Sequence, residues 1–273
     1  MGKIVAIANQ KGGVGKTTAA INLSSYLAKL GRKILLIDLD PQGNLTSGLG
    51  IDKTQIEKSS YHAILNHIAV NELIISTPIE NLSLVPSNLA LSGAEIELVS
   101  AENREYKLKD VTSLVLNSYD FIFIDTPPSL GLLTINALTT ANTVLIPLQC
   151  EYYSLEGVSQ LLYTINLVKR NLNQQLEIEG ILLNMADFRT KLTEQVIAEA
   201  REFFKGKTYK TVIPRNVKLS EAPGFGQPIL IYDPRSLGSK RYEELAKEFL
   251  ERNRYWQMPP KPNYETGIIT LAE

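Results

Sequence analysis

The sequence of 273 residues is poor in cysteine and in long apolar runs. Its one cysteine, Cys150, excludes an internal disulfide and a cysteine-ligated cluster within one chain. No apolar stretch approaches the roughly 20 residues that a membrane-spanning helix needs. A glycine-rich loop begins by residue 11, which leaves no room for a signal peptide, and residues 1–6 lack the Ser or Thr expected for myristoylation. We therefore expect a cytoplasmic protein.

Charge is nearly balanced over the chain but unevenly spread along it. The net charge is −1 at pH 7, and the 44% hydrophobic and 21% charged residues are typical of an ordinary globular protein. Residues 189–254 contain 14 Lys and Arg against 9 Asp and Glu, a local balance of +5, so the remainder is acidic. This asymmetry indicates an anionic partner for the C-terminal third.

A glycine-rich stretch, KGGVGKTT, lies between an apolar run at 4–8 and a helical pattern that continues to Leu30. Strand, glycine-rich turn and helix are the context of a phosphate-binding loop. Glycines allow consecutive N–H groups to turn toward an anion, and the helix N-terminus adds partial positive charge. Lys16 supplies a full charge for the outer phosphates, and the Thr17 hydroxyl is a natural Mg²⁺ ligand. The predicted ATP-binding residues of this loop are Lys11, Gly12, Gly13, Val14, Gly15, Lys16, Thr17 and Thr18.

Three acids stand at the ends of apolar runs. Asp38 ends the strand predicted over 33–38, Asp40 follows it, and Asp125 ends the strand predicted over 121–125. Ligands of open α/β sheets bind at the carboxyl ends of the strands. The second run has the form of a Walker B segment, whose Asp holds Mg²⁺ directly or through water. We therefore expect all three acids to belong to the nucleotide site.

Apolar runs alternate with helical patterns along the whole chain. The predicted strands are 4–8, 33–38, 81–86, 121–125, 143–147, 178–184 and 211–214. Beyond the helix after the loop, the predicted helices are 61–68, 89–99, 108–116, 154–169, 190–204 and 239–253. The alternation predicts an α/β fold with a single doubly wound, mostly parallel sheet and helices on both faces. We expect one domain over 1–254 and a proline-rich, flexible tail over 255–273.

The loop departs from the ordinary GxxxxGK[ST] form by a second lysine, Lys11. In this it resembles the deviant Walker A loop of the ParA/Soj chromosome-partitioning ATPases and of their relative MinD. The resemblance to the chromosomal Soj type covers roughly residues 2–252 and is carried further by 40–44, 94–98, 128–137, 149–153 and 213–223. It implies a P-loop fold and ATP hydrolysis with ATP and Mg²⁺ as cofactors. The single cysteine counts against the nitrogenase iron protein, which shares the loop type but needs cluster cysteines.

The resemblance also implies roles for single residues. The residue matching Asp40 orients the attacking water, and those matching Asp38 and Asp125 serve the Mg²⁺ shell together with Thr17. Lys11 of one subunit reaches the phosphates of its partner in an ATP-bound homodimer. The predicted catalytic residues are therefore Lys11, Lys16 and Asp40. The residues expected to hold the adenine are Asn184, Pro214, Arg215 and Asn216.

The same resemblance gives the basic third a partner, since ATP-bound dimers of this family bind double-stranded DNA without sequence preference. Scattered phosphate contacts suffice, because such binding is largely counterion release. Arg189 matches a DNA-contacting arginine of the family, and the further candidates are Lys218, Arg235, Lys240 and Arg241. The resemblance also implies association with the nucleoid. It further implies that a ParB/Spo0J-type centromere-binding protein stimulates hydrolysis and thereby release from DNA.

Two other functions stay open. A MinD-like ATPase that cycles on a membrane ends in an amphipathic targeting helix. Here we expect the apolar face of 239–253 to pack on the sheet, and prolines follow it, so we predict no membrane partner. An ATP-dependent amidating enzyme, such as a cobyrinic-acid amidase, needs an additional substrate domain or a glutaminase nucleophile. Cys150 lies at an apolar strand end, which does not suit such a nucleophile.

Overall fold

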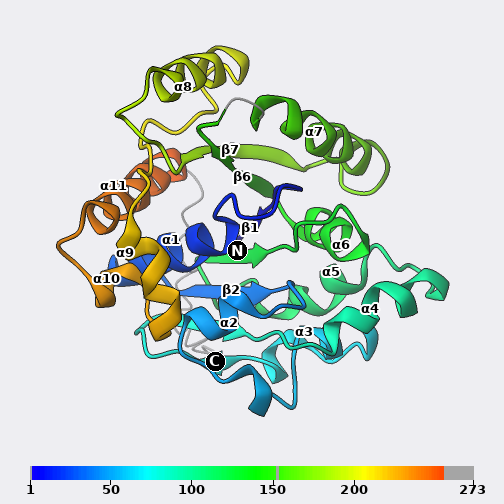
Figure 1. The fold of residues 1–273 in the computed structure, drawn as a ribbon. Helices are drawn as coiled ribbons and strands as arrows, with labels where there is room; N and C mark the ends of the chain where they lie inside the picture. The colour runs from blue at the N-terminus through cyan, green and yellow to red at the C-terminus, as the bar shows by residue number, and fades with distance from the viewer. Residues whose placement is uncertain (1, 152–153, 255–273) are drawn as a thin grey trace, which may run out of the picture.

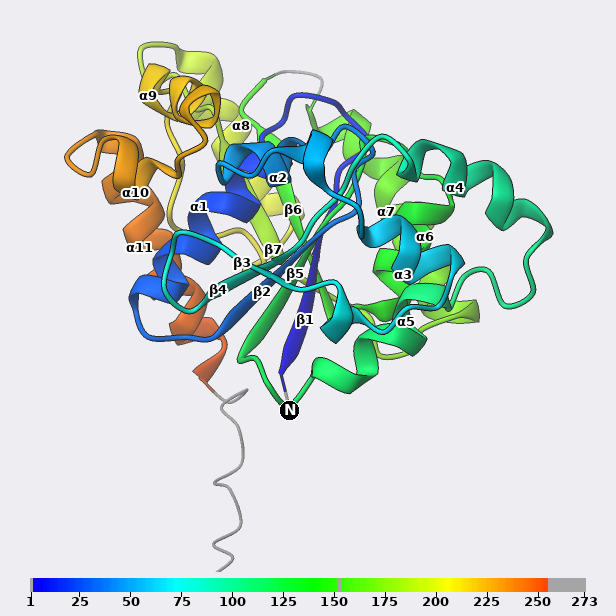
Figure 2. The same cartoon turned by 90° about the horizontal axis from the view of Figure 1, so that it is seen from below.

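A seven-stranded sheet forms the centre of the molecule (Figures 1 and 2). The computed structural model describes residues 2–151 and 154–254. The strand order is β3-β4-β2-β5-β1-β6-β7, and every neighbouring pair is parallel except β3–β4. The strands are β1 (Lys3–Ile7), β2 (Ile34–Asp38), β3 (Ile75–Ser76), β4 (Leu82–Val85), β5 (Phe121–Asp125), β6 (Thr143–Gln149) and β7 (Glu177–Asn184). The predicted mostly parallel, doubly wound sheet is confirmed.

Helices cover both faces of the sheet, with α1, α2 and α9 to α11 on one side and α3 to α7 on the other (Figure 2). The α-helices are α1 (Lys16–Lys29), α2 (Asn44–Gly48), α3 (Ser60–Leu65), α4 (Leu91–Glu97), α5 (Lys107–Thr112), α6 (Leu132–Thr140), α7 (Ser154–Asn171), α8 (Lys191–Phe203), α9 (Val217–Glu221), α10 (Ile229–Tyr232) and α11 (Leu237–Arg252). The short 3-10 helices are Lys53–Gln55, Val70–Glu72, Leu98–Ser100, Ser113–Val115 and Ala222–Phe225.

Alternation along the central strands divides the core into two layers. In β5, Phe121 and Phe123 pack in the layer of α1 and α11, and Ile122 and Ile124 in the layer of α3 to α7. Because both faces are covered, the strand reads as a continuous apolar run. Phe249 of α11 stands edge-on to the Phe121 ring, with 5.1 Å between ring centroids. The expected packing of the final helix on the sheet is confirmed.

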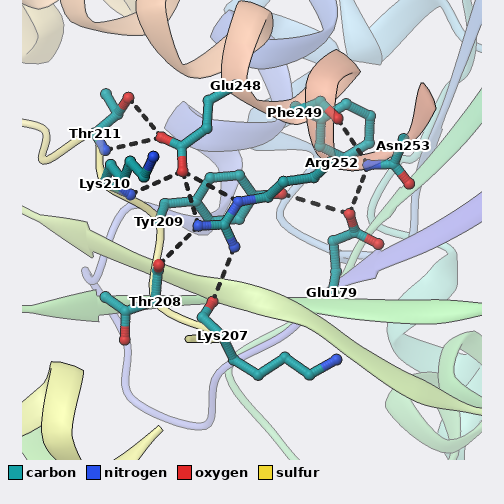
Figure 3. A network of polar contacts seen from close by, with 10 residues as sticks. All are labelled: Glu179, Lys207, Thr208, Tyr209, Lys210, Thr211, Glu248, Phe249, Arg252 and Asn253. Atoms are coloured by element: carbon teal, nitrogen blue, oxygen red, sulfur yellow. Dashed lines mark hydrogen bonds and ion pairs between the residues drawn. The ribbon is translucent and has the colours of Figure 1, made fainter. Parts of the chain in front are cut away.

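The strand predicted over 211–214 does not form. Its Ile213 N–H donates to the Leu183 carbonyl oxygen of β7 at 2.9 Å, and Pro214 forms an isolated bridge with Ala186, just beyond the end of β7. At its start, the backbone N–H groups of Lys210 and Thr211 donate to the Glu248 carboxylate of α11 at 2.8 and 2.9 Å (Figure 3). Because a side chain takes these two donors, they cannot continue a regular ladder with β7.

Several small elements have no counterpart in the sequence prediction. They are α2, α6, α9, α10 and the two-residue antiparallel strand β3. The other predicted strands and helices form within a few residues of the expected ends. The tail over 255–273 lies outside the described residues. One domain over 1–254 stays a prediction, which the sheet shared by both core layers supports.

Candidate functional site

The glycine-rich loop joins β1 to α1, and two of its glycines adopt conformations that other residues rarely reach. Gly13 has a φ of 73° and Gly15 a φ of 87°. A Cβ on Gly15 would also stand 2.2 Å from the side-chain nitrogen of Asn184. Glycine is therefore required there for both conformation and space. Helix α1 begins at the next residue, so the free N–H groups of its first turn lie at the loop.

A cavity of about 560 Å³ opens beside this loop. Segments far apart in the sequence meet around it: the loop, the chain that follows β2, and the turns that follow β5 and β7. Its lining includes Gly12, Gly13, Gly15, Lys16, Thr17, Thr18, Asp40, Gln42, Asn44, Ser47, Pro128 and Met185. The structure thus brings Asp40 into one cavity with most of the predicted phosphate-binding residues.

Lys16 lies almost wholly inside the protein, with 7% of its surface exposed. Its Nζ donates to the Lys11 carbonyl oxygen over 3.4 Å, a long hydrogen bond. Burial lowers the pKa of Lys16, and the carboxylates of Asp125 and Asp40 act against that shift. An anion in the cavity would favour the charged ammonium and offer it a stronger partner than the carbonyl.

Thr17 and Asp125 meet at the floor of the site, where the Thr17 hydroxyl donates to Asp125 Oδ2 at 2.7 Å. The other oxygen, Oδ1, is buried and has no hydrogen-bond partner in the described part of the chain. Burial and the neighbouring Asp38 carboxylate raise the pKa of Asp125 well above its usual range. A buried carboxylate oxygen that lacks a donor, beside a hydroxyl, suits a hard cation such as Mg²⁺.

Within residues 2–151 and 154–254, no group of three or more His, Cys, Asp or Glu side chains could hold a metal ion by itself. Mg²⁺ keeps several waters and is bound through one or two carboxylates together with phosphate oxygens of the substrate. Thr17 and Asp125 fit that mode of binding.

Asp38 ends β2 directly across from Asp125 at the end of β5. Both of its carboxylate oxygens accept hydrogen bonds. Oδ1 accepts from the Asp40 N–H at 3.1 Å, and Oδ2 accepts from the N–H and the hydroxyl of Thr46 at 2.9 and 2.7 Å. Burial raises the pKa of Asp38 to about 6, although these hydrogen bonds act against the shift. Asp38 is thus a buried acid tied to the segment that carries Asp40.

Replacing Asp125 by asparagine should stabilise the nucleotide-free protein while removing its ATPase activity. Because the pKa of Asp125 is raised in the folded protein, its protonated carboxyl contributes fully to stability below the pKa of about 3.9 that it has in the unfolded chain. This contribution is lost as the pH rises through the folded pKa. Asparagine can still bond to Thr17 and carries no charge. We expect the melting temperature at pH 7 to rise by about 3 °C or more, and the gain to shrink toward pH 4. Thermal unfolding from pH 4 to pH 8 measures both; a gain independent of pH would contradict the buried-charge explanation.

A second cavity, of about 440 Å³, adjoins the first, and Thr18, Met185 and Pro223 line both. All the residues expected to hold the adenine line this second cavity: Asn184, Pro214, Arg215 and Asn216. Asn184 ends β7 and donates to the carbonyl oxygen of the buried loop residue Val14 at 2.9 Å. A concave site of amide and apolar groups next to a phosphate loop suits a nucleobase.

Lys11 and Arg215 both face one carboxylate, that of Glu151. The distances are 3.1 Å from Lys11 Nζ and 3.6 Å from the Arg215 guanidinium. The Lys11 and Glu151 side chains are 44% and 48% exposed. An ion pair this exposed contributes little to stability. Lys11 can therefore exchange this partner for another anion at low cost.

The sequence prediction missed residues that shape the loop from other elements. Gln149, at the end of β6, donates from Nε2 to the Gly13 carbonyl oxygen at 3.0 Å. Met185 follows β7 with a φ of 54° and lines both cavities. The Soj-like stretch 149–153 is the one signal that could have indicated Gln149. Nothing in the sequence marks Met185.

The predicted DNA-binding residues lie on the surface of the C-terminal third. Lys218 is on α9, Arg235 precedes α11, and Lys240 and Arg241 are on α11; α9, α10 and α11 lie together in both views (Figures 1 and 2). Arg189 stands apart, in the turn between β7 and α8. Its side chain is 86% exposed and pairs with Asp187 at 2.6 Å. Lys218 and Arg241 each pair with a glutamate three residues farther along.

Comparison with known proteins identifies the family. The AAA domain family matches residues 2–178. The chain is 57% identical over 248 residues to the sporulation initiation inhibitor protein Soj of Bacillus subtilis, covering 91% of this chain and 98% of that protein. It is 52% identical over 253 residues to the chromosome partitioning protein ParA of Myxococcus xanthus, covering 93% and 89%. The chain belongs to the Soj/ParA family of chromosome-partitioning ATPases.

A solved structure shares the fold of this Soj/ParA-family ATPase. Cobyrinic acid a,c-diamide synthase of Mycobacterium smegmatis, with bound ATP analogue and magnesium, is 35% identical with a TM-score of 0.82, covering 93% of this chain and 96% of that one. Its name matches one of the alternative functions, but the Soj and ParA relatives are much more similar in sequence. In the part of the chain that the structure describes, no helix has the length and apolar character needed to cross a membrane.

Proposed function

We propose that this Soj/ParA-family ATPase binds ATP and Mg²⁺ across the two adjoining cavities, dimerises in the ATP-bound state and then binds DNA without sequence preference. The observation that carries the proposal is the convergence of Lys16, Thr17, Asp40 and Asp125 around one glycine-rich loop. Hydrolysis, stimulated by a ParB/Spo0J-type protein, releases the protein from DNA and so from the nucleoid. Bound ATP analogue and magnesium in the structure from Mycobacterium smegmatis support the choice of cofactors.

The loop side of the site binds the phosphates. Lys16 and the N-terminus of α1 hold the outer phosphate oxygens, which places a full and a partial positive charge where negative charge develops during phosphoryl transfer. Thr17 and Asp125 would hold Mg²⁺, which would neutralise phosphate charge. Asp38 would serve the Mg²⁺ shell indirectly, through water, since its two oxygens already accept three hydrogen bonds from Asp40 and Thr46.

Asp40 orients the attacking water. It lines the phosphate cavity with 8% of its surface exposed, so its carboxylate is shielded yet reachable. Oδ1 accepts the Gln42 N–H at 2.9 Å, which fixes the direction of the group. A fixed carboxylate can hold a water in line with the terminal phosphate.

Lys11 completes the site of a second subunit. Its ammonium pairs with exposed Glu151, and Lys11 is not among the residues that line the phosphate cavity. In an ATP-bound homodimer with two-fold symmetry, the two Lys11 side chains exchange Glu151 for the phosphates of the opposite subunit. Dimerisation therefore depends on nucleotide, because the phosphates supply the partner for Lys11.

Variants at Lys11 and Arg189 should be defective in different steps, dimerisation and DNA binding. Lys11→Ala should lose dimerisation and DNA binding together, since it removes the contact between subunits. Arg189→Glu should dimerise normally and bind DNA at least about tenfold more weakly, because it places negative charge near phosphates on both subunits. Gel shifts on unrelated duplexes over a salt series, with the mass followed by light scattering, separate the two steps.

Lys58→Glu is the matched control for Arg189→Glu, because it makes the same change of charge at an exposed residue outside the C-terminal third. It should bind DNA within about twofold of the wild type, and wild-type binding should weaken steeply with salt. If Arg189→Glu dimerised and bound DNA like Lys58→Glu, Arg189 would not belong to the DNA surface.

The experiment that tests the proposed function compares plasmid DNA, anionic vesicles and a small-molecule acceptor as targets of the ATP-bound protein. We expect ATP-dependent binding to DNA and hydrolysis without any acceptor. Binding to vesicles alone would favour the MinD-like membrane function. Turnover that required a carboxylic acid acceptor and an amine donor would favour an amidating enzyme, the function named for the structure from Mycobacterium smegmatis.

A further inference from the structure

Thr46 of α2 is fully buried, and its hydroxyl stands between two parts of the fold. Its Oγ1 accepts the backbone N–H of Ser87, just beyond β4, at 3.0 Å. The same hydroxyl donates to Asp38 Oδ2 at 2.7 Å, and the Thr46 N–H donates to that oxygen at 2.9 Å. One side chain therefore joins the end of β4, the start of α2 and the end of β2.

The hydrogen bonds continue from Asp38 to Asp40. The other oxygen of Asp38 accepts the Asp40 N–H at 3.1 Å. The chain then turns tightly, with the Gly43 N–H donating to the Asp40 carbonyl oxygen at 2.9 Å. The backbone at Asp40 is thus held from one side by Asp38 and from the other by a turn that leads into α2 and to Thr46.

Thr46 does not touch the reacting groups, because its side chain is fully buried and does not line the phosphate cavity. Its neighbours in α2, Asn44 and Ser47, do line that cavity. Any effect of Thr46 on hydrolysis must therefore pass through Asp38 and the segment that carries Asp40. A hydroxyl can accept one hydrogen bond and donate another at this place, whereas valine of the same shape offers neither.

We propose that Thr46 is a positioning residue for ATP hydrolysis, which sets the Asp38 carboxylate and through it the place of Asp40. This rests on the proposed role of Asp40 in orienting the attacking water. Small misplacements of a group that orients a reactant reduce the rate much more than the affinity. Thr46 thus acts on turnover rather than on nucleotide binding.

The test is the pair Thr46→Val and Thr46→Ser in the full chain. Thr46→Val should lower kcat for ATP about 10- to 100-fold and leave the affinity for a fluorescent ATP analogue within about threefold. Thr46→Ser, which restores the hydroxyl, should recover kcat to within about threefold of the wild type. If Thr46 had a purely structural role, Thr46→Val would instead lower thermal stability and nucleotide affinity together with kcat. Thr46→Ser would then not restore kcat separately from the other two quantities.

Thr54→Val is the matched control. Thr54 also donates both its N–H and its hydroxyl to one aspartate oxygen, Asp52 Oδ1, at 3.0 and 2.7 Å, but at an exposed site. It should leave kcat unchanged. If Thr46→Val does not fold, Thr46→Cys takes its place, because its thiol is a weaker hydrogen-bond donor of similar size. Its kcat should lie between that of Thr46→Ser and the value, about 10- to 100-fold below the wild type, expected for Thr46→Val.

Asp40→Asn, measured alongside, separates this inference from the function on which it rests. Normal hydrolysis by Asp40→Asn would overturn the role of Asp40 itself. Loss of hydrolysis by Asp40→Asn with normal kcat for Thr46→Val, or for a folded Thr46→Cys, would overturn only the positioning role of Thr46.

Discussion

Replacing Lys16 by alanine should weaken ATP binding by about 100-fold or more, which is the largest effect on binding that we expect from one side chain. The ammonium is the buried cation of the phosphate cavity, beside Asp125 and Asp40. Without it, the phosphates would meet these carboxylates with only partial charges of the loop and α1 to oppose the repulsion. Titration calorimetry with ATP and Mg²⁺ measures the loss.

Lys29→Ala is the control for this experiment, because it makes the same change in the last turn of the same helix. The Lys29 ammonium lies 5.6 Å from the centre of the Tyr26 ring and far along α1 from the loop. Its affinity for ATP should equal that of the wild type. Wild-type affinity in Lys16→Ala would defeat the assignment of the phosphate loop.

Replacing Asp40 by alanine should slow ATP hydrolysis by about 10²- to 10⁴-fold and leave ATP affinity within about threefold. The group that orients the water is lost, whereas Lys16, Thr17 and Asp125 still hold the nucleotide and its metal. Because hydrolysis ends the dimeric state, the variant should accumulate as an ATP-bound dimer that stays on DNA. Phosphate release and light scattering on the same sample measure both effects.

Asp52→Ala removes an exposed aspartate in the loop that follows α2 and should hydrolyse ATP at the wild-type rate. Asp40→Ala with normal turnover would exclude the water-orienting role. Asp40→Ala that stayed monomeric in ATP would separate hydrolysis from dimerisation and contradict the proposed cycle.

The parts of the site that could be predicted from the sequence are those encoded locally. The loop needs glycine at Gly13 and Gly15 because of their own φ values, and Lys16 and Thr17 follow it at fixed positions on α1. Register across parallel strands then places Asp38 beside Asp125, because both end strands that pair in the sheet. The alternation of strands and helices was sufficient to predict their meeting at one edge.

The parts that could not be predicted depend on contacts between distant segments or on burial from all sides. Helix α6 buries most of its residues, so it shows no apolar stripe by which a helical period could be found. The segment 211–214 has the composition of a strand, but the carboxylate of Glu248, more than thirty residues away, accepts the N–H groups of Thr211 and of the preceding Lys210. The bonds of Thr46 to Ser87 and of Gln149 to Gly13 are invisible in the sequence for the same reason.

The central claim is that ATP, held between the loop and the partner's Lys11, converts the monomer into a dimer. Light scattering after size-exclusion chromatography tests it most directly, with Mg²⁺ and either a non-hydrolysable ATP analogue, ADP or no nucleotide. We predict twice the monomer mass with the analogue, and the monomer mass with ADP and without nucleotide. The same mass in all three conditions, whether monomer or dimer, would contradict the claim.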